Sequence, residues 1–204
     1  MNDCGAEIGL QALLDHTADR LLSAQEEVLE TLSEQERSNL TLISKWGFDG
    51  ASGQSMYKQT IPNPDFQDGS IFMTSLSPLQ MFSSCTGEVE EKLIVWQNCR
   101  ASSTKFVRPI EFQFTKESTQ VIVNQKNKIE NQIKMLRPTT IHMGDMECSV
   151  THKMYLTMAD GKVINAITDT ASTQTCNVCR AKPSEMNKLH LHTFCLEIHK
   201  YLRK

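Results

Sequence analysis

The sequence of 204 residues lacks long apolar runs, because no stretch approaches the roughly 18 consecutive apolar residues that a membrane span needs. Its first residues, MNDCGAEIGLQALL, contain an acid but no basic residue before the apolar positions, which is wrong for a secretory signal. Internal repeats and low-complexity tracts are missing as well. These absences predict an intracellular protein, nuclear or cytoplasmic, without membrane contact.

An excess of positive charge is also missing. The chain has 21 Lys and Arg against 24 Asp and Glu, for a formal net charge of -3, so non-specific nucleic-acid binding cannot be argued from bulk charge. The seven cysteines are an odd number, which argues against a disulfide framework and favours free thiols or metal ligands. Apolar residues make up 39% of the chain, which is ordinary for a globular protein and argues against wholesale disorder.

The N-terminal segment carries an amphipathic stripe beside a Glu-rich face. Its apolar residues recur at spacings of three, four and seven, which predicts one helix from about Ala6 to Ser33. The stripe consists of Leu10, Leu13, Leu14, Leu21, Leu22, Val28, Leu29 and Leu32. We therefore expect residues 1–40 to form a helical segment that packs on the rest of the fold or on a protein partner.

The remaining chain shows strand patterns first and mixed patterns later. Alternating apolar residues predict strands at 40–48, 70–82, 91–99, 104–114 and 148–158. Helical spacing runs over 117–136 and is stopped by Arg137-Pro138, a short helix is expected at 160–170, and another helix follows Pro183. This order of elements predicts a mixed α/β fold.

Four strings occur in a fixed order between Ser44 and Asn187: SKWGFDGASGQSMYKQ, DGSIFMTSLSPLQ, RPIEFQFTKEST and YLTMADGKVINAITDTASTQTCNVC. The series resembles a transposon-derived family, the catalytic core of the V(D)J recombinase large subunit and of Transib-type transposases. The resemblance implies an RNase H-like fold over residues 41–170, a mixed sheet flanked by helices. It also implies a DDE triad of carboxylates that holds two divalent metal ions.

Asp49 is the first candidate site residue. As a bare pattern, an Asp-Gly pair after a strand marks a turn, whereas under the resemblance Asp49 matches the first acid of the triad. The position that matches the second acid is Lys116, whose ammonium has no lone pair for Mg²⁺. For the third acid the chain offers only Glu185 and Glu197, and neither lies in a recognisable match. We therefore expect that magnesium binding and nuclease activity are lost.

A specific geometry follows from this assignment. Asp49 should lie at the C-terminal end of a central strand and face a shallow polar cleft. Lys116 should lie within salt-bridge reach of Asp49, in the space that a cation would have filled. If Lys116 instead points away, Glu117 or Glu111 becomes the better candidate for the second acid.

Residues 171–204 form a Cys/His-rich segment that resembles the truncated start of a zinc-binding insert. Its candidate zinc ligands are Cys176, Cys179, Cys195 and His199, which have finger-like spacing. The resemblance supports Cys176 and Cys179 alone. The spacing leaves open that the CxxC pair is a redox pair or two incidental thiols.

Basic residues interleave with aromatic ones, a pattern that suits contacts to DNA phosphates and bases. The candidate DNA-binding residues are Lys45, Lys58, Arg100, Lys105 and Arg108. Ordinary core aromatics and solvated charges are the alternative interpretation. The sequence thus leaves two hypotheses for function. One is a transposase-derived domain with residual DNA binding, and the other is a non-enzymatic, zinc-stabilised protein-interaction module.

Overall fold

The computed structural model describes residues 5–52, 70–84 and 92–170, together with 172, 174–177 and 180–185. Its contacts divide the chain into two compact units, which we describe separately. The first comprises Met1–Glu117 and Lys126–Met158, and the second comprises Ser118–Gln125 and Ala159–Lys204.

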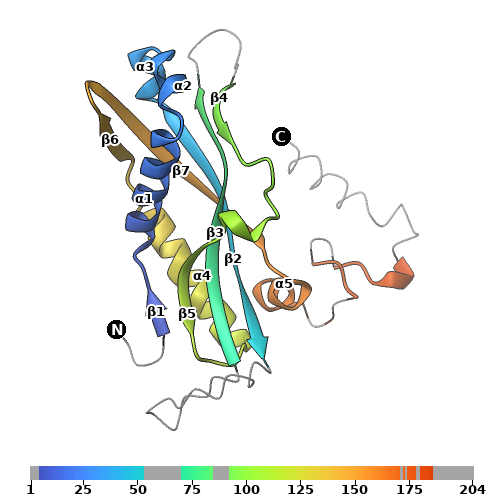
Figure 1. Ribbon diagram of the computed structural model, residues 1–204. Coiled ribbons are helices and arrows are strands. Elements are labelled where there is room, and N and C mark those ends of the chain that lie inside the picture. Colours follow the sequence, from blue (N-terminus) through green and yellow to red (C-terminus); the bar gives the residue numbers. More distant parts are fainter. Residues whose placement is uncertain are drawn as a thin grey trace. The chain divides into compact units, whose positions relative to one another are not determined.

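The first unit contains a mixed sheet (Figure 1). Its strands are β1 (Gly5–Glu7), β2 (Leu40–Ser52), β3 (Ser70–Ser84), β4 (Lys92–Gln97), β5 (Arg108–Gln113), β6 (Thr139–Met143) and β7 (Met146–Met158). Their order is β1-β5-β3-β2-β7-β6, with β4 paired to β3. The pair β2 and β7 is parallel, and every other pair is antiparallel. The mixed α/β class is therefore confirmed.

Strand β2 is an inner strand, since it pairs with β3 on one side and β7 on the other. Its even-numbered side chains are buried on one face of the sheet. Leu42, Trp46 and Phe48 are almost fully buried, whereas Asp49 is exposed. This alternation is the period of two that a sheet with one core face requires. The predicted strand through Phe48 is confirmed, but the expected position of Asp49 at its C-terminal end is wrong. The strand continues to Ser52, because its pairing with β3 extends to the last residue of the pair, Ser70, so Asp49 lies within the strand.

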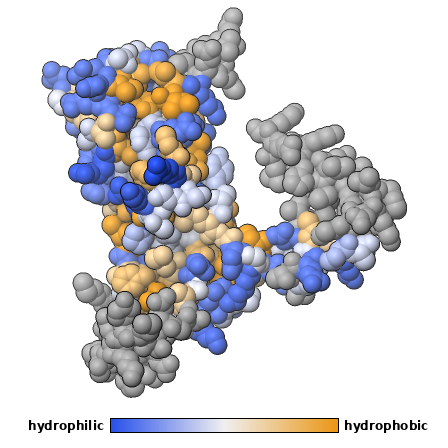
Figure 2. All heavy atoms as spheres, turned by 45° about the vertical axis from the view of Figure 1, so that its right-hand side comes forward, coloured by the Kyte–Doolittle hydropathy of each residue, from blue (hydrophilic) through white to orange (hydrophobic). Residues whose placement is uncertain are grey.

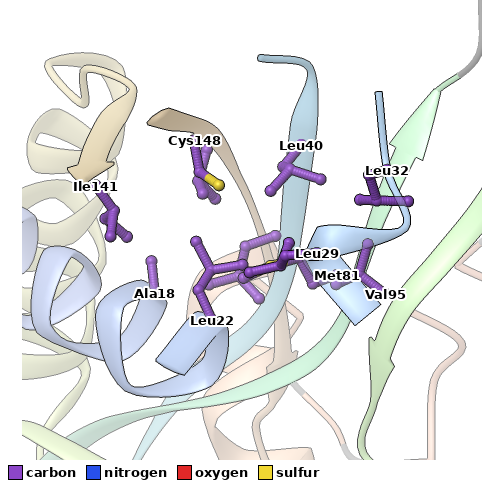
Figure 3. Close-up of a cluster of buried hydrophobic side chains, with 11 residues drawn as sticks. Ala18, Leu22, Leu29, Leu32, Leu40, Met81, Val95, Ile141 and Cys148 are labelled. Carbon is purple, nitrogen blue, oxygen red and sulfur yellow. The ribbon is translucent and has the colours of Figure 1, made fainter. Parts of the chain in front are cut away.

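The core face is covered by the N-terminal helices. Figure 3 shows side chains of α1 (Leu10–Ser23), the α2 region (Glu26–Glu30) and five strands converging on one apolar cluster. The cluster consists of Ala18, Leu22, Leu29, Leu32, Leu40, Leu42, Met81, Val95, Ile141, Cys148 and Val150. The N-terminal stripe thus packs on the protein's own sheet.

The prediction of one continuous helix from Ala6 to Ser33 is wrong. The segment forms strand β1, then α1, α2 and α3 (Glu34–Arg37). Ser33 starts α3 with a capping box, in which its hydroxyl accepts from Glu36 N and the Glu36 carboxylate accepts from Ser33 N. Short helices joined by turns keep the leucines on the curved core face, which one straight helix would not follow.

Helix α4 (Thr119–Lys134) agrees with the predicted helix of residues 117–136. Its part within the first unit buries Ile129 and contacts α1, because the Gln132 side-chain oxygen accepts from Leu10 N at 3.1 Å. Pro138 then blocks further helix, and β6 begins at the next residue. Neither β6 nor β1 was predicted from the sequence.

The second unit contains α5 (Gly161–Thr168), as expected from the sequence, and the turn η3 (Pro183–Glu185). The Asp160 carboxylate caps α5 by accepting from Val163 N at 2.8 Å. At the other end of α5, the Arg180 guanidinium donates to the carbonyls of Thr168 and Asp169. A cation at a helix C-terminus also suits the helix dipole.

Candidate functional site

Asp49 lies on the face of the sheet that is opposite the N-terminal helices. It pairs with Met73 of β3, and Met73 pairs with Phe112 of β5, so these three side chains form one row across the sheet. Met73 is 42% exposed and Phe112 is 37% exposed. Phe112 also makes an edge contact with Phe114, with ring centroids 5.9 Å apart. Within this row the neighbours of Asp49 are apolar, whereas the sequence predicted polar surroundings.

Lys116 does not pair with Asp49. Strand β5 ends at Gln113, and Lys116 is an exposed residue beyond that end. Among the residues that the structure describes, no ion pair joins Lys116 to Asp49. The predicted salt bridge is wrong because the strand stops three residues before position 116, so the register of β5 no longer directs this side chain.

Glu117 lies close to the chain of β2, but on the wrong face to act with Asp49. A methyl group built on Gly50 would lie 2.6 Å from Glu117 Cβ and 2.7 Å from its carboxylate oxygen Oε2. Gly50 is therefore needed for this close approach. Because consecutive strand residues point to opposite faces, the side of Gly50 that meets Glu117 is the face opposite Asp49. The two carboxylates do not converge.

Glu111, the other alternative acid, belongs to an ionic cluster on the core face. Lys128 Nζ lies 2.8 Å from Oε2 of Glu111 and 2.8 Å from Oε2 of Glu7. Gln113 donates to the Glu111 carboxylate at 2.7 Å. Partial burial alone would lower the pKa of Lys128, but the hydrogen bonds to Glu111 and Glu7 raise it above its ordinary value of 10.5. Glu111 thus forms a structural ion pair with Lys128 and does not extend toward Asp49.

The candidate metal ligands are only partly within the described residues. Cys176 is half-buried, while Cys179, Cys195 and His199 lie outside the described residues. Around Cys176 the chain turns back on itself, since Arg180 N donates to the Cys176 carbonyl and Cys176 N donates to the Ala181 carbonyl. In the described part of the chain, no group of three or more His, Cys, Asp or Glu side chains is placed to hold a metal ion.

The candidate DNA-binding residues do not lie together on one surface. Arg100 and Lys105 are exposed in the connection between β4 and β5, and Lys105 lies in the short turn η2 (Thr104–Phe106). Lys45 lies on the Asp49 face of β2, whereas Arg108 lies opposite Leu76, which faces the core. The fifth candidate, Lys58, lies outside the described residues.

An aromatic pair accompanies the two exposed cations of that connection. The rings of Trp96 and Phe106 meet edge to face with centroids 6.1 Å apart. Phe106 is 36% exposed. The β4–β5 connection therefore combines two cations with an accessible aromatic surface.

A partly buried chain of polar side chains, which the sequence did not reveal, links α1, β6 and β7. Thr139 Oγ1 donates to Asp15 Oδ1, and it lies 2.7 Å from His152 Nε2. Burial lowers the pKa of His152 below its ordinary value of 6.5, and the Asp15 charge only partly opposes this effect. Asp15 and Thr139 are 124 positions apart in the sequence. No local sequence pattern could therefore have shown that they meet.

No protein-family model matches the chain, and no curated protein matches it either. Among the described residues, no helix combines the length and the apolarity that are needed to cross a membrane.

Proposed function

We propose that the chain is a transposase-derived RNase H-like domain that has lost the chemistry of strand transfer and cleavage and retains DNA binding. The observation that carries the proposal is the position of Asp49. The motif that resembles the first acid of the family lies in the central strand of a mixed sheet with helices. A mixed sheet flanked by helices is the architecture that the resemblance implies.

The described side chains do not fit a pair of magnesium ions at Asp49. Two-metal hydrolysis needs several oxygen ligands around ions about 4 Å apart. Position 116 supplies an ammonium, the Glu117 carboxylate lies on the other face of the sheet, and Glu111 is paired with Lys128. One carboxylate beside Met73 and Phe112 is a weak ligand set for a hard divalent cation.

A cleavage assay tests the loss of chemistry. We expect no Mg²⁺-dependent or Mn²⁺-dependent cutting of a DNA duplex by the wild-type protein. The matched variant is Asp49→Asn, which keeps the size of the side chain and removes its charge. Cleavage that requires a divalent metal and disappears in Asp49→Asn would refute the proposal.

The retained DNA binding rests on the β4–β5 connection. Arg100 and Lys105 supply cations for phosphates, and the exposed ring of Phe106 offers a stacking surface. In an electrophoretic shift titrated with salt, Arg100→Ala/Lys105→Ala should reduce the slope of log affinity against log salt by about 2 if both residues contact phosphates. The control is Lys134→Ala at the C-terminal end of α4, which should leave that slope unchanged.

A structural zinc ion is part of the proposal for the C-terminal segment. Cys176 has the thiol and the tight turn that a CxxC ligand pair uses. A metal that binds only the folded state stabilises it, so a chelator should lower the melting temperature of the wild-type protein. Cys176→Ser should abolish this effect, and Cys99→Ser, at an exposed free thiol, should not. Purified protein that contains no zinc would argue against this part.

The second candidate function is a protein-interaction module. An apolar area lies at the end of the first unit that carries α2, α3 and β4 (Figures 1 and 2). There β4 exposes Leu93 and Ile94, and both short helices are rich in glutamate. Exposed apolar side chains with a charged rim suit a protein partner. The absence of any DNA shift at low salt would favour this function over the first.

A further inference from the structure

Strand β6 is an edge strand, because it pairs with β7 on one side and with no other described strand on its other side. Such an edge presents backbone N–H and C=O groups that can pair with another chain. The feature is independent of the DNA-binding proposal, since it lies at the opposite side of β2 from β3 and β5.

The hairpin between β6 and β7 determines which backbone groups face outward. Met143 pairs with Met146 across a two-residue turn in which Gly144 has φ +57. The residues that flank such a turn hydrogen-bond to each other, and hydrogen-bonded and non-hydrogen-bonded pairs then alternate along an antiparallel ladder. The N–H and C=O groups of Thr140 and His142 consequently lie on the outer edge of β6.

A hollow of about 710 Å³ runs along this edge. One wall comes from α1 and includes Asp15, His16 and Asp19. The other wall is formed by six consecutive residues, 137–142. Because neighbouring strand residues point to opposite faces, consecutive residues can line one hollow only where it follows the edge of the strand. The hollow is therefore a trough beside the edge of β6 that no other described strand pairs with.

We propose that β6 pairs antiparallel with β6 of a second copy of this chain, which joins the two sheets through a two-fold axis at Ile141. In this register Thr140 faces His142 of the second copy, so outward backbone groups meet outward backbone groups on both sides of the axis. Arg137 and Asp145 each lie four residues from Ile141. Arg137 of each copy therefore lies near the β6–β7 turn of the other, which carries Asp145.

The edge is self-complementary in both hydrogen bonding and charge, as a symmetric two-fold interface requires. Registers centred on Thr140 or His142 would also match outward groups, but they would move Arg137 two residues away from Asp145. Strand β6 has only five residues, so we expect a weak dimer, with a Kd on the order of 0.1 mM, at the low end of specific association.

A charge exchange tests the proposed register. In light scattering or sedimentation across a concentration series, the wild-type protein should dimerise. Arg137→Glu alone and Asp145→Arg alone should each weaken self-association about tenfold or more, because each creates two like-charge contacts per dimer. An equimolar mixture of the two variants should regain association, since the mixed dimer has two opposite-charge contacts.

Matched controls separate this effect from a general change in net charge. Lys153→Glu and Glu27→Arg make similar changes at exposed positions outside β6, and both should dimerise like the wild type. Regained association in the mixture also shows that each variant is folded. The proposal is refuted if the wild-type protein is monomeric up to about 1 mM, where a complex with a Kd of ~1 mM would be evident. It is equally refuted if the mixture of the two variants stays monomeric.

Discussion

Replacing Lys128 with methionine tests whether the ionic cluster on the core face holds Glu111. Methionine keeps the length and the apolar stem of the lysine and removes the charge. In the wild-type protein Lys128 contacts Glu111 and Glu7 at 2.8 Å each. The variant leaves two carboxylates near each other without their shared cation, and Glu111 is only 8% exposed.

The expected cost lies between two limits. Breaking a fully buried ion pair by removal of one partner costs about 3–5 kcal/mol, and losing an exposed pair costs about 0–1 kcal/mol. The Lys128 side chain is 37% exposed and that of Glu111 is 10% exposed, so the pair lies between these cases. We expect Lys128→Met to lower the free energy of unfolding by about 2 kcal/mol. In a chain of this size that corresponds to a melting temperature lower by roughly 4–8 °C.

The matched control is Lys126→Met, two residues earlier on α4. Lys126 pairs with Glu130 at 2.8 Å in an i,i+4 arrangement, which contributes only about 0.3–0.5 kcal/mol. Urea denaturation of both variants measures the difference. Adding Glu111→Gln to Lys128→Met should restore part of the lost stability, because it removes a buried charge that no longer has Lys128 beside it. Equal costs for the two lysine variants would show that Glu111 does not depend on Lys128.

The pH dependence of this effect follows from the raised pKa of Lys128. A folded-state pKa above 10.5 means that the folded protein holds this proton more tightly than the unfolded chain. The contribution is then fully present below pH 10.5 and is lost as the pH rises through the folded-state pKa. The stability difference between wild type and Lys128→Met should therefore be constant from about pH 7 to 9 and shrink in stronger alkali.

Three further outcomes are expected. Stability should fall as the pH drops below 6.5, because burial lowers the pKa of His152 and the unfolded chain then binds the proton more readily; if His152→Gln does not flatten this dependence, the assignment is wrong. Gly47→Ala should cost at least about 3 kcal/mol, because its methyl group would lie 1.8 Å from a backbone oxygen, whereas Gly9→Ala meets nothing within 4 Å and should be nearly neutral in thermal denaturation. Met73→Asp should create Tb³⁺ binding detectable by luminescence, since it adds a carboxylate to the row of the first candidate acid, and binding by Lys116→Asp instead would contradict the geometry described above.

The long elements were predictable because their own residues carry the signal. Strand β2 has regular alternation, and Pro138 marks the end of the helical pattern in α4. Strand β6 was missed because five residues, Thr139–Met143, are too few for a period to stand out. The break before α3 did have a local signal, since Ser33 and Glu36 form the S-x-x-E signature of a helix start. The leucine periodicity masked it, because both sides of the break pack on the same core.

The surroundings of Asp49 were less predictable. They depend on where neighbouring strands end and on which face of the sheet each side chain lies. The sequence identifies Asp49 as a residue that follows a buried alternating run, and the structure agrees that its side chain points away from the core. It does not say that β5 ends at Gln113, which decides the direction of Lys116. Nor does it contain a signal for the contact of Glu117 with Gly50, since those residues meet only through tertiary packing.

Under the proposed function, the lack of a metal site would not depend on position 116 alone. A hard divalent cation needs about six oxygen ligands in close geometry, and the row that contains Asp49 offers a thioether at Met73 and a ring at Phe112. The Glu117 carboxylate, which meets β2 at Gly50, would have to cross the sheet, and in a strand only a register shift of one residue exchanges the two faces. Such a shift would expose Trp46 and Phe48, which are both 2% exposed, at a cost of several kcal/mol. A substitution of Lys116 by an acid leaves this constraint in place, so a divalent metal site on the Asp49 face would require further ligands in the Asp49 row.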